Sequence, residues 1–125
     1  MNHNPPYRSA CAYIRGSASG PRLHAELLQQ SRRITAFCAS GLHVLTSTVV
    51  EEAGDSQPEL LRLLDKATSP QRPFDLLIVC SESRLSHDPA TLRQVMARLA
   101  AAGVTVTALD SAQASAIAPM AAEIL

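Results

Sequence analysis

The sequence predicts a single α/β domain, a three-layer sandwich with a largely parallel central sheet. A chain of 125 residues that is 46% hydrophobic can bury one core but is too short for two ordinary domains. Short apolar segments alternate with amphipathic ones, which is typical of strands that alternate with helices. The segment from Phe74 to Cys80 is almost continuously apolar, as expected for a parallel strand buried on both faces.

The first helix is the clearest element of the pattern. Residues 1–7 are polar and proline-bearing and are expected to form a mobile lead-in, so we assign the domain to residues 8–110. Ala10 to Ile14 is predicted to be a short buried strand, followed by a glycine- and serine-rich loop. Pro21 then begins a helix that ends near Gly41, with arginines and glutamines opposite an apolar face of Leu23, Leu27, Ile34 and Phe37.

The middle of the chain predicts a strand, a loop and a second helix. The strand covers Leu42 to Val50, which is rich in β-branched residues, and the polar loop covers Glu51 to Gln57. Pro58 opens a shorter helix that carries Leu60, Leu61 and Leu64. The prolines between Ser69 and Pro73 end this helix before the buried strand at Phe74 to Cys80.

The last third repeats the same alternation. A polar loop from Ser81 to His87 leads to Asp88, a natural N-cap with Pro89 at the first helical position. That helix is expected to end before Gly103, and Val104 to Leu109 forms the last strand. Residues 111–125 are alanine-rich, and Pro119 is expected to begin a helix that is truncated at the end of the chain.

Composition excludes several classes of site. Eleven basic and eleven acidic side chains cancel, so any bound phosphate must be held by local groups. Cys11, Cys38 and Cys80 lack CxxC spacing and are predicted to be buried, reduced thiols. With no signal-like or membrane-spanning apolar run, the protein is expected to be cytoplasmic and to bind no membrane.

No metal and no cofactor are predicted. The histidines His3, His24 and His43 have no second ligand at convincing spacing. Glu51, Glu52 and Asp55 are interpreted as a solvated acidic loop and are assigned no role.

The loops that follow the strands predict the site. In a parallel sheet the loops at Ser17, Gln57 and Arg84 converge at the carboxyl edge, where ligands bind. Arg15 and Ser17 alternate at the end of a strand, which pairs a hydroxyl with a guanidinium on one side. Because arginines neutralise the oxygens of a phosphodiester and orient its phosphorus, we expect Ser17 to attack phosphate.

Three motifs resemble one family. The sequence Tyr13-Ile14-Arg15-Gly16-Ser17 is similar to the Tyr-Ala-Arg-Val-Ser motif of serine recombinases, the resolvases and DNA invertases. Ser83-Arg84-Leu85-Ser86-His87-Asp88 resembles the family's Asp-Arg-Leu-Ser-Arg-Asp, and Gln57-Pro58-Glu59-Leu60 resembles its Arg-Pro-x-Leu. With the similar Gly103-Val104 turn, the resemblance runs from about Arg8 to Asp110.

The resemblance implies a resolvase-like catalytic domain that needs no metal or nucleotide. Its serine cleaves DNA by transesterification through a 5′-phosphoserine link, and Arg15, Ser17 and Arg84 carry these roles here. The sequence departs from the family pattern at Gln57 and His87, which replace arginines, and at Ser83, which replaces an aspartate. His87 is a candidate substitute cation or general acid.

Two further positions extend the comparison with the family. Glu26 matches its pattern, whereas Leu28 replaces a glutamine.

The implied partner is DNA, contacted through its backbone. In the family a dimerisation helix and a helix-turn-helix follow the last strand, so residues 111–125 are interpreted as the truncated start of that helix. The chain is accordingly expected to form a homodimer or to pair with an intact recombinase. Two alternatives remain: a non-catalytic interaction module, and a flavodoxin-like domain that holds a phosphorylated small molecule at Gly16 to Gly20.

Overall fold

The computed structural model describes residues 8–41, 43–52 and 56–110. The described chain runs β1 (Arg8–Arg15), α1 (Pro21–Ser40), β2 (His43–Glu51), α2 (Pro58–Ala67), β3 (Leu76–Val79), a 3₁₀ turn η1 (Glu82–Arg84), α3 (Pro89–Ala101) and β4 (Thr105–Ala108). The expected lead-in at residues 1–7 and the expected helix at Pro119 lie outside the described residues. The predicted alternation of strands and helices is confirmed.

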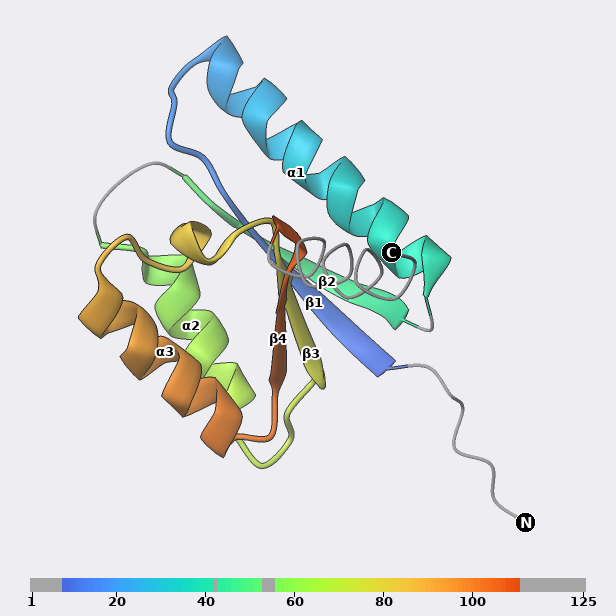
Figure 1. Cartoon of the computed structure of the whole chain (residues 1–125), viewed down its shortest axis with the longest axis vertical. Helices are drawn as coiled ribbons and strands as arrows, with labels where there is room; N and C mark the ends of the chain where they lie inside the picture. Colours follow the sequence, from blue (N-terminus) through green and yellow to red (C-terminus); the bar gives the residue numbers. More distant parts are fainter. Residues whose placement is uncertain (1–7, 42, 53–55, 111–125) are drawn as a thin grey trace, which may run out of the picture.

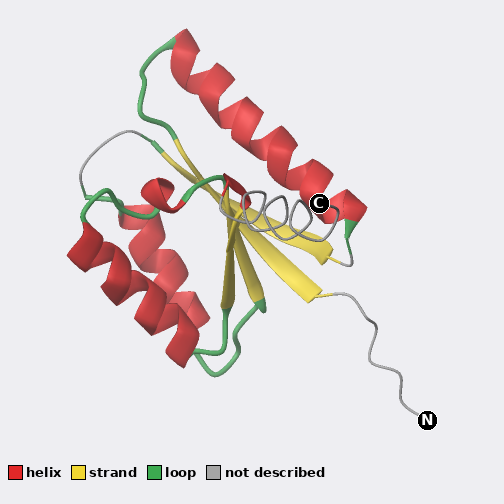
Figure 2. Cartoon of the chain, in the orientation of Figure 1, coloured by secondary structure: helices red, strands yellow, loops and turns green. Residues whose placement is uncertain are grey.

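Within the described residues, four parallel strands form a sheet in the order β2-β1-β3-β4. Figure 1 shows α1 on one face of this sheet and α2 with α3 on the other, which confirms the three-layer prediction. Figure 2 shows the loops after β1 and β3 leaving the sheet at the same end. The order places β1 at an inner position, so its carboxyl end lies between the loops of its neighbours.

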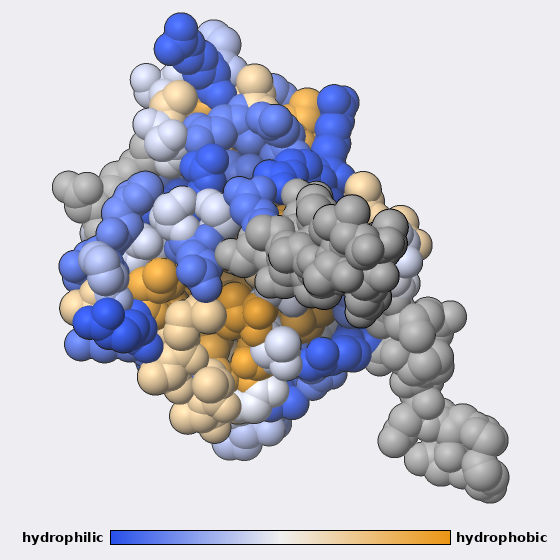
Figure 3. All heavy atoms as spheres, viewed as in Figure 1, coloured by the Kyte–Doolittle hydropathy of each residue, from blue (hydrophilic) through white to orange (hydrophobic). Residues whose placement is uncertain are grey.

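The two faces of the sheet have separate apolar cores. On the α1 side, Ile34 and Cys38 pack against alternate β1 residues such as Ala12 and Ile14. On the other side, leucines of α2 and α3 cover Tyr13 and Leu77. Figure 3 shows apolar side chains gathered over α3 and β4, whereas polar ones cover most of α1. Cys11, Cys38 and Cys80 are buried free thiols, as predicted.

Some predicted boundaries were wrong. β3 is shorter than predicted, although Phe74 and Cys80 at its two sides are buried. In α2 the buried residues are Leu60, Leu63, Leu64 and Ala67, whereas Leu61 is 54% exposed. Asp88 caps α3 as expected, accepting a hydrogen bond from the Thr91 N–H at 3.1 Å.

Candidate active site

The end of β1 is fixed by a buried glutamine that the sequence pattern misplaced. Gln30 was predicted on the solvent side of α1, but it is only 4% exposed. Its Oε1 accepts from the Arg15 N–H at 3.1 Å and its Nε2 donates to the Arg15 carbonyl at 2.8 Å. The pairing of β1 with β3 ends at Ala12, and beyond this point the Gln30 amide hydrogen-bonds to the backbone of β1.

Gly16 lets the chain turn closely over the start of α1. A Cβ at this position would collide with Leu23 Cδ1, and the Gly16 N–H donates to the Glu51 carbonyl at 3.0 Å. The strand ends at Arg15, so the predicted alternation does not continue to Ser17, which lies in the exposed loop. The position of Ser17 therefore depends on the hydrogen bonds of this loop and not on the strand.

Glu26 is the residue that joins Ser17 to Arg84. Its Oε1 accepts from the N–H groups of Ser17 at 2.8 Å and Ala18 at 3.1 Å. Its Oε2 accepts from the Ser17 hydroxyl at 2.9 Å and forms an ion pair with Arg84 Nη1 at 2.9 Å. The same Arg84 nitrogen donates to the Arg15 carbonyl at 3.0 Å. The structure thus connects two predicted site residues through a third that was noted only as a family match.

The ionisation of Glu26 reflects this set of donors. Burial alone raises the pKa of its carboxyl, but hydrogen bonds from the Ser17 N–H and hydroxyl, the Ala18 N–H and Arg84 lower the pKa to about 2. The side chain is 18% exposed. Glu26 is therefore an anion throughout the neutral range, held against the hydroxyl of Ser17.

Gln57 holds the loop after β3 to the end of β1. It lies before α2 with φ 47° and ψ 57°, the left-handed region that costs a side-chain-bearing residue about 1–2 kcal/mol. Its Nε2 donates to the Tyr13 hydroxyl at 3.1 Å and to the Leu85 carbonyl at 2.9 Å. The three loops predicted to converge, at Ser17, Gln57 and Arg84, do meet at this edge.

Glu51 corrects the prediction of a solvated acidic loop. It is the last residue of β2 and only 3% exposed. Its carboxylate accepts from the Tyr13 hydroxyl at 3.0 Å and from the N–H groups of Glu59 at 3.2 Å and Leu60 at 2.9 Å. The first N–H groups of a helix lack partners within the helix and favour a nearby negative charge. The start of α2 therefore stabilises the buried carboxylate of Glu51. Glu52 is exposed as predicted, and Asp55 lies outside the described residues.

Tyr13 is the buried link between Glu51 and Gln57. Burial raises the pKa of its hydroxyl, the hydrogen bond from Gln57 and the charge of Arg15 lower it, and Glu51 raises it, with a net shift well upward. Tyr13 therefore stays a neutral donor to Glu51 and an acceptor from Gln57. Tyr13 thus holds Glu51 and Gln57 in place beneath the loops of the candidate site by one hydrogen bond to each.

The other predicted positions lie outside the hydrogen bonds that join Ser17, Glu26 and Arg84. Ser83 is exposed and its Oγ is 2.8 Å from the Ser81 Oγ. His87 and Leu28 are also exposed. Within the described ranges, neither Ser83 nor His87 hydrogen-bonds to Ser17, Glu26 or Arg84.

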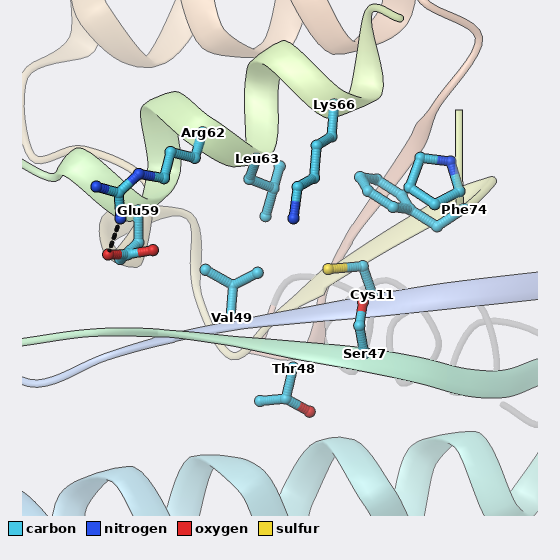
Figure 4. A pocket seen from close by; sticks show the side chains of 10 residues that line it. Cys11, Ser47, Thr48, Val49, Glu59, Arg62, Leu63, Lys66 and Phe74 are labelled. Atoms are coloured by element: carbon cyan, nitrogen blue, oxygen red, sulfur yellow. Dashed lines mark hydrogen bonds and ion pairs between the residues drawn. The ribbon is translucent and has the colours of Figure 1, made fainter. Parts of the chain in front are cut away.

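A separate cavity of about 440 Å³ opens between β2 and α2. Figure 4 shows the Cys11 thiol and the Lys66 side chain facing one another across it. Burial raises the pKa of the Cys11 thiol, while a hydrogen bond with Ser47 and the charge of Lys66 lower it, with a net shift upward. None of its lining residues hydrogen-bonds to Ser17, Glu26 or Arg84 within the described ranges, so we treat the cavity as separate from the candidate active site.

Two negative findings concern residues 8–41, 43–52 and 56–110. In these ranges no group of three histidine, cysteine, aspartate or glutamate side chains is placed to hold a metal ion. Of the helices described there, none has the length and apolarity to cross a membrane.

The fold and the site define an α/β domain that presents a serine hydroxyl beside an arginine at the carboxyl edge of a parallel sheet. The family model described as the resolvase N-terminal domain matches residues 10–124. The chain therefore belongs to the resolvase N-terminal domain family. A search of curated protein sequences gave no match.

Solved structures show the same fold at low sequence identity. A resolvase family site-specific recombinase from Streptococcus pneumoniae is 16% identical with a TM-score of 0.73, covering 93% of this chain and 89% of that one. The N-terminal catalytic domain of TP901-1 integrase is 17% identical with a TM-score of 0.66, covering 94% of this chain and 98% of that one. The C-terminal catalytic domain of ISC1926 TnpA, an IS607-like serine recombinase, is 17% identical with a TM-score of 0.70, covering 81% of this chain and 67% of that one. The predicted resolvase-like fold is confirmed.

Proposed function

We propose that this domain cleaves and rejoins DNA strands through Ser17. The Ser17 Oγ attacks a phosphodiester, an Oγ–P bond forms, and the bond from phosphorus to the 3′-oxygen breaks. The serine proton leaves to solvent or a nearby base, the 3′-oxygen takes up a proton, and the strand stays linked as a 5′-phosphoserine. The reverse attack by a 3′-hydroxyl rejoins DNA without metal or nucleotide.

The observation that carries this proposal is the link from Ser17 through Glu26 to Arg84. The Ser17 hydroxyl and the Arg84 guanidinium both bind the same carboxylate oxygen of Glu26. The guanidinium therefore lies close to the place where Ser17 would attack a phosphate. Preorganised cations stabilise the negative charge that develops on phosphate oxygens. Arg15, at the end of the adjacent strand, supplies a second cation in this proposal.

DNA is the proposed partner, contacted through its backbone. Because basic and acidic residues are equal in number, the domain alone supplies few phosphate contacts, and its affinity should be low and should fall with salt. Stable engagement would then come from a DNA-binding segment or from a second recombinase subunit.

A test of the reaction uses the full chain and a pool of short duplexes in which sulfur replaces the bridging 3′-oxygen. A thiolate leaves without needing a general acid and rejoins poorly, so cleavage accumulates the covalent product. We expect an increase in protein mass equal to one 5′-phosphoryl strand. An unchanged mass with this activated substrate, both for the chain alone and when it is tethered beside the duplex by a fused DNA-binding domain, would overturn the proposal.

One observation favours a second function, a non-catalytic module that pairs with an intact recombinase. Gln57 replaces a family arginine and commits its amide to Tyr13 and to backbone carbonyls, so it offers no cation to phosphate. Such a module would bind a full-length family member and lower its strand cleavage without forming an adduct. Sedimentation of the mixture, followed by a cleavage assay, separates this function from the first.

A further inference from the structure

We propose that the Ser17 and Ala18 N–H groups and Arg84 form the cradle for the scissile phosphate, and that Glu26 occupies this cradle as an internal substitute for phosphate. This inference rests on the proposed function, since it names the groups that receive the substrate and the group that keeps them closed. It assigns to two backbone donors and one acidic residue roles that go beyond the serine and its arginines.

Four donors converge on the two carboxylate oxygens of Glu26, and the cradle consists of three of them, all except the Ser17 hydroxyl. Successive N–H groups, those of Ser17 and Ala18, converge on one carboxylate oxygen at 2.8 and 3.1 Å. The Ser17 hydroxyl and Arg84 Nη1 converge on the other oxygen, each at 2.9 Å. Successive backbone N–H groups aimed at one point are a recurring device for binding anions, and a guanidinium suits phosphate oxygens. Nothing in this donor set is specific for a carboxylate.

The occupant comes from the chain itself. Glu26 lies in the second turn of α1, and the loop between Ser17 and Pro21 folds back over it. Its carboxylate presents two oxygens to these donors, as a phosphodiester presents its two non-bridging oxygens. A phosphate and the Glu26 carboxylate would repel one another at the same position. DNA must therefore displace Glu26 before Ser17 can be aligned with phosphorus.

Displacement has a second consequence for the nucleophile. While Glu26 occupies the cradle, the Ser17 hydroxyl donates a hydrogen bond to its carboxylate. The position of the hydroxyl is then set by Glu26 and not by the substrate. Once phosphate takes the two N–H groups and Arg84, Glu26 can remain bonded only to the hydroxyl. The same residue then becomes a positioning residue for Ser17 and a nearby acceptor for its proton.

The test measures phosphate binding directly, apart from DNA cleavage. Amide NMR spectra of the wild type and Glu26→Gln are recorded during titration with inorganic phosphate and with dimethyl phosphate. We expect the Ser17 and Ala18 signals of Glu26→Gln to shift on titration, with at least about tenfold tighter binding than in the wild type. Glu82→Gln is the matched control, because Glu82 is exposed, lies two residues from Arg84 and loses the same charge. It should bind like the wild type.

Several outcomes would overturn the inference. Equal affinity in the wild type and Glu26→Gln contradicts it, and an equal gain in Glu82→Gln would show a general effect of charge. Should Glu26→Gln fail to fold, Glu26→Asp keeps the charge but shortens the reach; it should show an intermediate gain, and no gain contradicts the inference. Tighter phosphate binding in Glu26→Gln without any DNA adduct would support the cradle and reject the proposed function. A DNA adduct together with unchanged phosphate binding would support the proposed function and reject the cradle.

Discussion

At the scale of single residues, the site depends on a few polar side chains whose partners are far away in the sequence. The sequence predicts Ser17, Arg15 and Arg84 as site residues, from the strands they follow and from motifs that resemble those of serine recombinases. The order of these residues along the chain does not reveal Glu26 as the bridge, because the contact depends on how the loop from Ser17 folds over α1. Sequence spacing predicts which loops meet, whereas the atoms that touch depend on the loop conformation.

The charge of Glu26 predicts a pH dependence of stability. Its pKa in the folded protein, about 2, lies below the ordinary value of 4.5, so it stabilises the fold above about pH 4.5 and this contribution is lost as the pH falls toward 2. Urea unfolding at pH 6 and pH 3 should show that the wild type loses about 1–2 kcal/mol more than Glu26→Gln over this interval. Parallel losses in both proteins would contradict the hydrogen-bonded anion described here.

The replacement of a family arginine by Gln57 predicts a gain of function. Gln57→Arg should increase the yield of the covalent DNA product about tenfold or more, because one well-placed donor is commonly worth about 10²-fold in rate. The yield is measured by denaturing electrophoresis with the sulfur-substituted duplexes. Ser56→Arg adds the same charge at the neighbouring exposed position and should leave the yield nearly unchanged. Equal gains in both variants would show that net charge, and not a cation at position 57, limits the reaction.

At the scale of elements, apolar periodicity predicted the order of strands and helices but not the buried polar residues. Pro21, Pro58 and Pro89 mark the helix starts because proline fits the first turn, and the Asp88 cap could be recognised locally. Gln30 and Glu51 were assigned to solvent because their residue types are usually exposed. Each is buried where backbone groups lack partners, at the end of β1 and at the start of α2.

The capping role of Glu51 predicts a loss of stability on a conservative change. In Glu51→Gln one of the two acceptor oxygens becomes an amide nitrogen that faces an N–H group of α2, so the free energy of unfolding should fall by about 1–3 kcal/mol. Chemical denaturation followed by circular dichroism provides the measurement. Glu52→Gln, at the adjacent exposed residue, should change stability by less than about 0.5 kcal/mol. A similar effect of the two substitutions would argue against the capping role.

At the scale of the whole molecule, the parallel sheet gathers the residues of the candidate site at one edge. Its order, β2-β1-β3-β4, brings the ends of β1 and β2 and the loop after β3 to a common place, and α1 closes over it. The fold class and family were predictable because they depend on alternation and motifs that are local in sequence. The bridge that Glu26 makes between Ser17 and Arg84 was not, because it arises from packing between α1 and two loops.

The most direct test of the central claim is to locate the covalent DNA linkage. The full chain, tethered beside the sulfur-substituted duplex by a fused DNA-binding domain, is digested after reaction, and the nucleotide-bearing peptide is sequenced by mass spectrometry. We predict a 5′-phosphoryl modification on Ser17 that is lost in Ser17→Ala and retained in Ser19→Ala, a substitution in the same exposed loop. A modification on another residue, or an adduct that persists in Ser17→Ala, would contradict it.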